Sequence, residues 1–233
     1  MKSLVTQISK THQIGGAKAH SIIRLLTKGT DDLHPLLFYH YLAQVFGPSE
    51  QSSIIYVRLQ LLSSLSSYFS KYLEFDYETD FKDKIIVEVG AGPRGSILNT
   101  KGNFKRGIVI EPLIDRWPSD IREDYEKVGI EIIAAPYEDL DIDEQVDETW
   151  FFNVVQHVFD PKEQLELAKK TSKTIRVFEP IGTGTDTAHP HYITEETFTD
   201  VLGNFGQIFK GGTEDGFFSC DCYYGTWNES DNV

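Results

Sequence analysis

The stretch "KIIVEVGAGPRGSIL", residues 84–98, decides the fold because it joins an apolar run to a glycine-rich turn. Residues 85–89 are apolar except for Glu88, a pattern that favours a strand buried on both faces. Gly90, Gly92 and Gly95 follow directly. Glycines allow a tight turn and let a ligand approach the backbone closely. We therefore expect a ligand site where this strand ends.

Further apolar runs follow along the chain, at residues 106–112, 130–136, 148–155 and 173–180. Polar stretches compatible with helices separate them, and this alternation predicts βαβ units in a doubly wound α/β layer with a mostly parallel sheet. The last part, "FGQIFKGGTEDGFFSCDCYYGTW", contains two strand-like runs joined by a glycine-rich turn, which predicts a terminal hairpin.

The first 80 residues have a different pattern, since apolar residues recur there at helical spacing and no strand signal interrupts them. We expect an N-terminal helical cap over residues 1–80 and a ligand-binding domain over residues 81–233, divided in the polar stretch "DYETDFKDK". Aromatic residues of the cap, such as Tyr39 or Tyr41, are candidates for a lid over a substrate.

Composition excludes several classes of partner. The net charge of −14 opposes tight binding to nucleic acid, because that affinity comes from Lys and Arg displacing counterions. No apolar run is long enough to span a bilayer, so no membrane partner is expected. The beginning, "MKSLVTQISKTHQIGG", lacks the features of a secretion signal. We expect a cytoplasmic protein.

Two cofactors compete for the glycine-rich turn. Read as G-x-G-x-x-G it fits NAD, and read as E-x-G-x-G it fits S-adenosylmethionine; Glu111, which ends the next run, suits the ribose of either. Glu88 separates them, because a carboxylate repels a pyrophosphate but complements a sulfonium and an ammonium group. Only "SILNTK" follows Gly95 before "GNFKRG", and so short a helix offers little dipole to phosphates. S-adenosylmethionine is favoured.

At this point the sequence resembles the class I S-adenosylmethionine-dependent methyltransferases. The resemblance covers roughly residues 82–225 and rests on five motifs in the expected order. The motifs are "VEVGAGPRGS", "VIEP", "APYEDLDIDEQVDETWFFNVVQHVFDP", "IRVFEP" and "HPHYITEETF".

The resemblance implies a seven-stranded sheet whose last strand is antiparallel, and methyl transfer from S-adenosylmethionine to a small-molecule or sugar-like acceptor. By position, it assigns Glu88, Gly90, Gly92, Asn153 and Val154 to the methionine side of the cofactor, Glu111 to the ribose, Pro112 to the adenine, and Tyr137 and Glu138 to the adenine edge. Many members have Asp where Pro136 stands, and that Asp contacts the amino group of adenine. Tyr137 or Glu138 is expected to make this contact instead.

Methyl transfer requires alignment of donor and acceptor, and it needs a base only if the acceptor must lose a proton. His157 and His189 are the catalytic candidates, with His191 beside them, because histidine titrates near neutral pH. The ordinary alternatives are a helix cap, packing against the cofactor, or a rigid turn set by Pro190. The spacing of these histidines predicts no metal site. An NAD-dependent oxidoreductase and a non-catalytic interaction module remain as rival functions.

Overall fold

The computed structural model describes residues 66–92, 94–112, 114–116, 119–140, 144–185, 189–211 and 220–232. The predictions made for residues 1–65, which include most of the helical cap with Tyr39 and Tyr41, lie outside these residues. The described part begins in a helix, residues 66–72.

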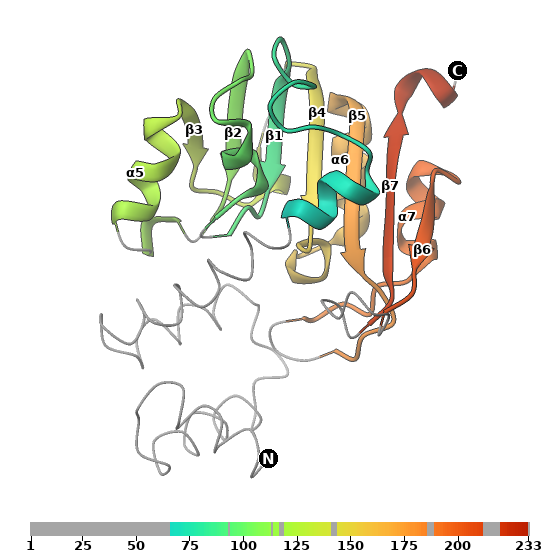
Figure 1. The fold of residues 1–233 in the computed structure, drawn as a ribbon. Coiled ribbons are helices and arrows are strands. Elements are labelled where there is room, and N and C mark those ends of the chain that lie inside the picture. The colour runs from blue at the N-terminus through green and yellow to red at the C-terminus, as the bar shows by residue number, and fades with distance from the viewer. Residues whose placement is uncertain are drawn as a thin grey trace, which may run out of the picture.

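A seven-stranded sheet forms the centre of the molecule, in the order β3-β2-β1-β4-β5-β7-β6 (Figure 1). Strands β1 to β5 are parallel, while β7 lies antiparallel between β5 and β6. The predicted sheet with its antiparallel last strand and the terminal hairpin are confirmed. The strands are β1 (Ile85–Val89), β2 (Arg106–Ile110), β3 (Ile130–Ile133), β4 (Val146–Phe152), β5 (Ser172–Pro180), β6 (Gly206–Phe209) and β7 (Cys222–Asn228).

Helical segments cover both faces of the sheet, as the alternating pattern predicts. On one face α6 and α7 contribute Leu165 and Phe198 to the core, and on the other α5 and η1 contribute Tyr125 and Ile97. The helices are α5 (Ser119–Lys127), α6 (Pro161–Thr171) and α7 (Glu195–Leu202), and the 3-10 helices are η1 (Ser96–Thr100), η2 (Ile114–Arg116), η3 (Tyr137–Asp139), η4 (Val155–His157) and η5 (Glu229–Asn232).

The end of the predicted cap packs into the core of the sheet. Phe69 stacks on Phe152 of β4 with ring centroids 4.5 Å apart, and Phe75 and Phe81 are buried around Trp150. Residues on both sides of the predicted boundary near residue 80 therefore share one hydrophobic core.

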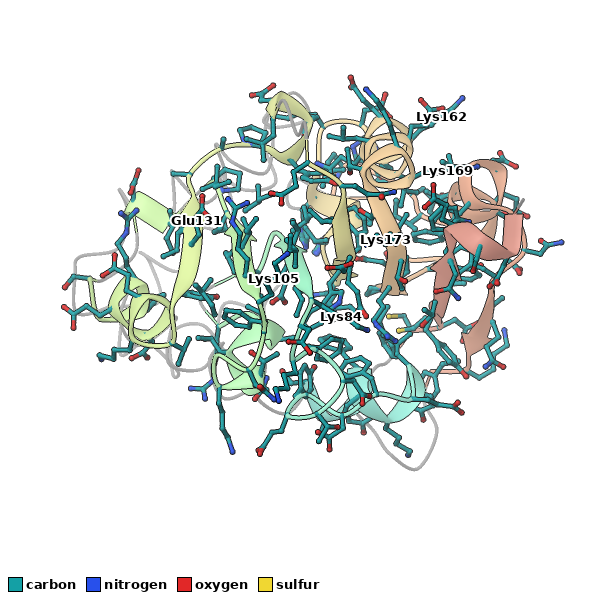
Figure 2. All side chains as sticks on the ribbon, turned by 90° about the horizontal axis from the view of Figure 1, so that it is seen from above. Lys84, Lys105, Glu131, Lys162, Lys169 and Lys173 are labelled. Atoms are coloured by element: carbon teal, nitrogen blue, oxygen red, sulfur yellow. The ribbon has the colours of Figure 1, made fainter. Side chains whose placement is uncertain are left out.

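The amino edge of the sheet is closed by ion pairs. The buried Glu148 accepts hydrogen bonds from Arg176 Nε at 2.7 Å and from Lys84 Nζ at 2.5 Å, and Lys173 pairs with Asp147. Figure 2 looks onto this edge and shows Lys84 and Lys173 over the middle of the sheet. In open α/β sheets a ligand usually binds at the opposite, carboxyl edge of the parallel strands, so we expect a ligand site there. No helix among the described residues is both long and apolar enough to cross a membrane.

Candidate functional site

The glycine-rich turn, residues 90–95, lies where β1 ends and contacts the turns after β2 and β4. Gly90 and Gly92 have positive φ values of 59° and 66°, a conformation that L side chains rarely adopt. A Cβ placed on Gly90 would lie 2.1 Å from Cγ2 of Val154. The first glycine is therefore required both by the backbone and by the close approach of the turn after β4.

Glu88 holds the segment that follows this turn. Its two carboxylate oxygens accept the backbone N–H groups of Ser96 and Ile97 at 2.8 and 2.7 Å, at the start of η1. The side chain is only 3% exposed, and burial raises its pKa to about 7 although both N–H bonds lower it. Glu88 thus serves as a cap for η1, with no oxygen turned to open solvent.

Tyr125 also contacts the glycine-rich turn, which the sequence did not predict. Its hydroxyl accepts the N–H of Gly95 at 2.5 Å and donates to the carbonyl oxygen of Gly92 at 3.0 Å, so it ties the turn to α5. The spacing of Ile121 and Tyr125, four residues apart on α5, signals two core positions. It does not signal the partners of the hydroxyl.

Glu111 follows β2 directly and lies beside the glycine-rich turn. Its Oε2 accepts the N–H of Gly92 at 3.0 Å, and the side chain is 5% exposed. Pro112 comes next and is half-buried. The structure therefore brings Gly90, Gly92, Glu111 and Pro112 together at one edge of the sheet, as predicted from their order in the sequence.

The segment after β3 contains Tyr137, which belongs to the core, and Glu138, which is a candidate site residue. The side chain of Tyr137 is buried against Phe151, with its hydroxyl 3.3 Å from Thr171 Oγ1, so only its backbone remains for a ligand at this edge. Glu138 accepts a hydrogen bond from Gln164 Nε2 through Oε2. Among the described residues, Oε1 of Glu138 and Oε1 of Gln164 are buried acceptors with no hydrogen-bond partner.

The turn after β4 carries Asn153 and Val154. Asn153 has a left-handed φ of 59°, which is uncommon for any residue but glycine. The N–H of Val154 donates to Oε1 of Glu179 at 2.7 Å. Glu179, at the end of β5, is fully buried, and burial raises its pKa to about 8. The sequence prediction missed its role, although an acid inside the apolar ending of "IRVFEP" is a visible signal.

The histidines gather just beyond this turn. His157 ends η4, and its ring centroid lies 4.7 Å from that of His189. Nε2 of His191 lies 2.8 Å from the carbonyl oxygen of Val158, which ties its segment to the end of η4. The structure thus brings the two catalytic candidates together. No group of three or more His, Cys, Asp or Glu among the described residues could hold a metal ion.

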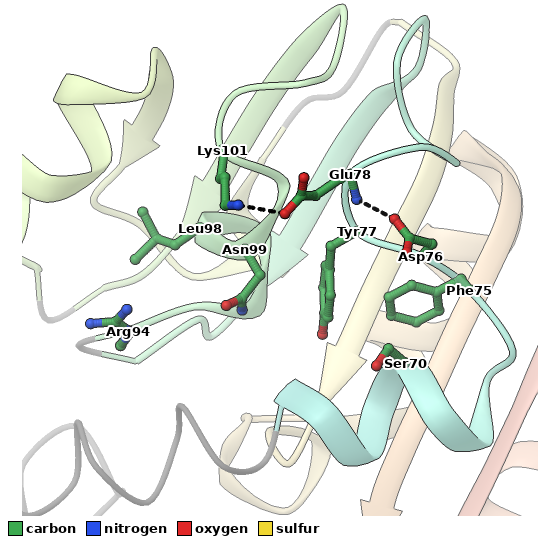
Figure 3. A pocket seen from close by; sticks show the side chains of 9 residues that line it. All are labelled: Ser70, Phe75, Asp76, Tyr77, Glu78, Arg94, Leu98, Asn99 and Lys101. Carbon is green, nitrogen blue, oxygen red and sulfur yellow. Dashed lines mark hydrogen bonds and ion pairs between the residues drawn. The ribbon is translucent and has the colours of Figure 1, made fainter.

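A cavity of about 440 Å³ opens beside this site, between η1 and the segment 70–78 (Figure 3). Of the described residues of the glycine-rich turn, Arg94 alone lines it, and Glu78 and Lys101, which form an ion pair, line it as well. None of the residues predicted for the cofactor or for catalysis lines this cavity.

Comparison with known proteins shows the fold. No family model and no curated protein sequence matches this chain. Among solved structures, geranyl diphosphate C-methyltransferase from Streptomyces coelicolor A3(2) is similar, with 13% identity and a TM-score of 0.54 over 78% of this chain and 84% of that one. The 1,6-didemethyltoxoflavin-N1-methyltransferase of Burkholderia thailandensis has 16% identity and a TM-score of 0.54 over 83% and 89%. The chain therefore has the class I methyltransferase fold.

Proposed function

We propose that this protein transfers a methyl group from S-adenosylmethionine to a small-molecule acceptor. The observation that carries the proposal is the contact between Glu111, directly after β2, and the glycine-rich turn after β1, on a sheet with the methyltransferase strand order. Both similar structures named above were determined with S-adenosylhomocysteine, the product of S-adenosylmethionine.

Three parts of the edge would hold the cofactor. Glu111 would accept hydrogen bonds from the ribose hydroxyls, which is the strong, charge-assisted kind. The backbone at Gly90 and Gly92 would pass close to the methionine end, opposite Asn153 and Val154. These groups all lie at the carboxyl edge of β1, β2 and β4, the usual place for a ligand in an open α/β sheet.

The adenine side has an acceptor pair that suits an amino group. Glu138 and Gln164 each have a buried oxygen without a partner among the described residues, and the two side chains are hydrogen-bonded to each other. Buried polar atoms in proteins are rarely left without a partner, so an absent donor is expected here. The exocyclic amino group of adenine would supply that donor. Glu138 would then accept the hydrogen bond from adenine that Pro136, which has no side-chain acceptor, cannot accept.

From the sequence we expect Glu88 to contact the cofactor directly, and here we assign it a different role. Because its two oxygens already accept the N–H groups of Ser96 and Ile97, it would fix the glycine-rich turn, and only its ionised form would favour a cationic cofactor, through charge rather than through a hydrogen bond.

When bound, S-adenosylmethionine supplies an electrophilic methyl group. The chain's own residues would orient the acceptor for in-line attack and exclude water. His157, at the end of the turn after β4, and His189, whose ring lies beside it, would take a proton from an acceptor that must lose one.

The topology argues against the oxidoreductase. A dinucleotide-binding fold has the strand order 3-2-1-4-5-6, whereas here an antiparallel β7 lies between β5 and β6. The same glycines and Glu111 are therefore better explained by the methyl donor.

Calorimetry tests the proposal. We expect the full-length protein to bind S-adenosylhomocysteine with a dissociation constant near micromolar, roughly −8 kcal/mol, and not to bind NAD. Binding of NAD without a response to S-adenosylhomocysteine would contradict the proposal. Transfer of a radiolabelled methyl group to members of a small-molecule panel separates an enzyme from a module that merely retains the cofactor.

A further inference from the structure

Glu179 is a fully buried acid in the apolar carboxyl end of β5. Its Oε1 accepts the N–H of Val154 at 2.7 Å, and the N–H groups of Val155 and Asn153 also lie close enough to lower the pKa of the carboxyl. Within the described residues, Oε2 makes no hydrogen bond of normal geometry. Burying a carboxyl group is costly even beside backbone N–H groups, and burial still dominates the pKa of Glu179, so an apolar side chain would be the more stable choice for packing alone. A local cost of this kind is typical of a functional position.

The turn that Glu179 bonds is itself strained. Asn153 adopts a left-handed backbone conformation, which is uncommon for a residue other than glycine. Two bonds from β5 restrain this turn: the N–H of Asn153 donates to the carbonyl oxygen of Phe178 at 2.9 Å, and the N–H of Val154 donates to Glu179. Without the bond to Glu179, only the bond to Phe178 would remain of these two.

The position of this turn matters because Val154 touches the glycine-rich turn. The space at Gly90 is filled by Cγ2 of Val154, so a displacement of Val154 changes the wall beside the end of β1. The N–H of His157 also donates to the carbonyl oxygen of Val154 at 2.8 Å, which links the same turn to the histidines.

We propose that Glu179 is a positioning residue that fixes the turn at residues 153–157 in the shape required by the methionine end of the cofactor. It acts through Val154 and touches neither cofactor nor acceptor, because its side chain is completely buried. This inference rests on the proposed function and names a residue of the site that the fold alone does not assign.

The test compares two ligands that differ at the methionine end. S-adenosylhomocysteine carries the amino acid moiety, whereas 5′-methylthioadenosine has the adenine, ribose and sulfur without it. Glu179→Met removes the acceptor but keeps the length of the side chain. We expect it to weaken S-adenosylhomocysteine at least tenfold and to leave 5′-methylthioadenosine within twofold. Glu179→Gln keeps a carbonyl oxygen for Val154 and should restore S-adenosylhomocysteine binding to within threefold of wild type.

Glu148→Gln is the matched control, because Glu148 is also a buried acid of the sheet but lies among the ion pairs of the amino edge. It should lower the melting temperature and leave both affinities unchanged. If Glu179→Met is unfolded by circular dichroism, Glu179→Asp, which shortens the reach by one methylene, takes its place with the same expected contrast.

Equal weakening of both ligands, or no weakening of either, would overturn the positioning role and leave the proposed function intact. A wild-type protein that binds neither ligand would overturn the proposed function, and this inference with it.

Discussion

The backbone N–H of Gly92 donates to Oε2 of Glu111 at 3.0 Å, so the acid that follows β2 is bonded to the turn that follows β1. Two segments that the sequence separates thus form one wall at the carboxyl edge of the sheet. A ligand bound to Glu111 would therefore lie beside the glycine-rich turn.

Glu111→Ala is expected to weaken S-adenosylhomocysteine at least tenfold in calorimetry. The change removes hydrogen bonds from a charged acceptor, each worth about 1.5–3 kcal/mol, and it also releases the N–H of Gly92. Glu131→Ala on the neighbouring strand is the control, since this acid is half-exposed and pairs with Arg106 at the surface. Its affinity should stay within twofold of wild type. An unchanged dissociation constant for Glu111→Ala would remove the ribose assignment.

Gly90→Ala should destabilise the protein more than Gly129→Ala. Both positions have positive φ, at 59° and 77°, and this alone costs an alanine about 1–2 kcal/mol. A Cβ at Gly90 also collides with Val154, whereas one at Gly129 meets nothing within 4 Å. Overpacking adds about 1–3 kcal/mol. Urea unfolding followed by circular dichroism measures the difference, and equal losses for the two variants would show that the contact with Val154 is relaxed in solution.

Tyr125→Phe should lower the free energy of unfolding by about 1–3 kcal/mol, because the buried N–H of Gly95 loses its acceptor. It should also weaken S-adenosylhomocysteine, since the turn loses its tie to α5. Tyr137→Phe is the matched control, as it deletes a buried hydroxyl with a longer contact of 3.3 Å to Thr171. A larger loss of affinity for Tyr137→Phe than for Tyr125→Phe would contradict the role assigned to Tyr125.

Stability should fall as the pH rises through neutrality, in part because of Glu88. Burial raises its pKa from 4.5 to about 7 in the folded protein, so between these values the folded state binds more protons than the unfolded chain. The stabilisation by the neutral acid is complete below about pH 4.5 and is lost as the pH rises through about 7, a change of roughly 3 kcal/mol.

Urea unfolding of wild type and Glu88→Gln at pH 5.5, 7 and 8 tests this dependence. Glu88→Gln should be less stable at every pH, because its amide leaves one N–H of η1 unpaired, but its stability should decline less with pH. Glu126→Gln, on the exposed side of α5, should keep the wild-type slope. Parallel slopes for wild type and Glu88→Gln would show that Glu88 is ionised over the whole range.

The sequence alone determined which segments form strands and the order in which strands and helices follow one another along the chain. Apolar runs such as residues 85–89 and 106–110 form strands because burial of both faces requires a local pattern that is visible without a fold. The start of α6 is equally local: Asp160 caps it by accepting the N–H groups of Lys162 and Glu163, and Pro161 begins it. The meeting of Glu111 with the glycine-rich turn followed from the rule that ligand sites lie at the carboxyl edge of parallel strands.

Only the tertiary structure decided what the buried acids do. Glu88, Glu111 and Glu179 each stand at or near the end of an apolar run, and their sequence patterns are alike. One caps η1, one bonds Gly92, and one holds Val154, a residue 25 positions earlier in the chain. Tyr125 likewise reaches Gly95 from 30 positions away. The partner of a buried polar group depends on which loops the packing of the sheet brings within about 3 Å, and no local pattern contains that distance.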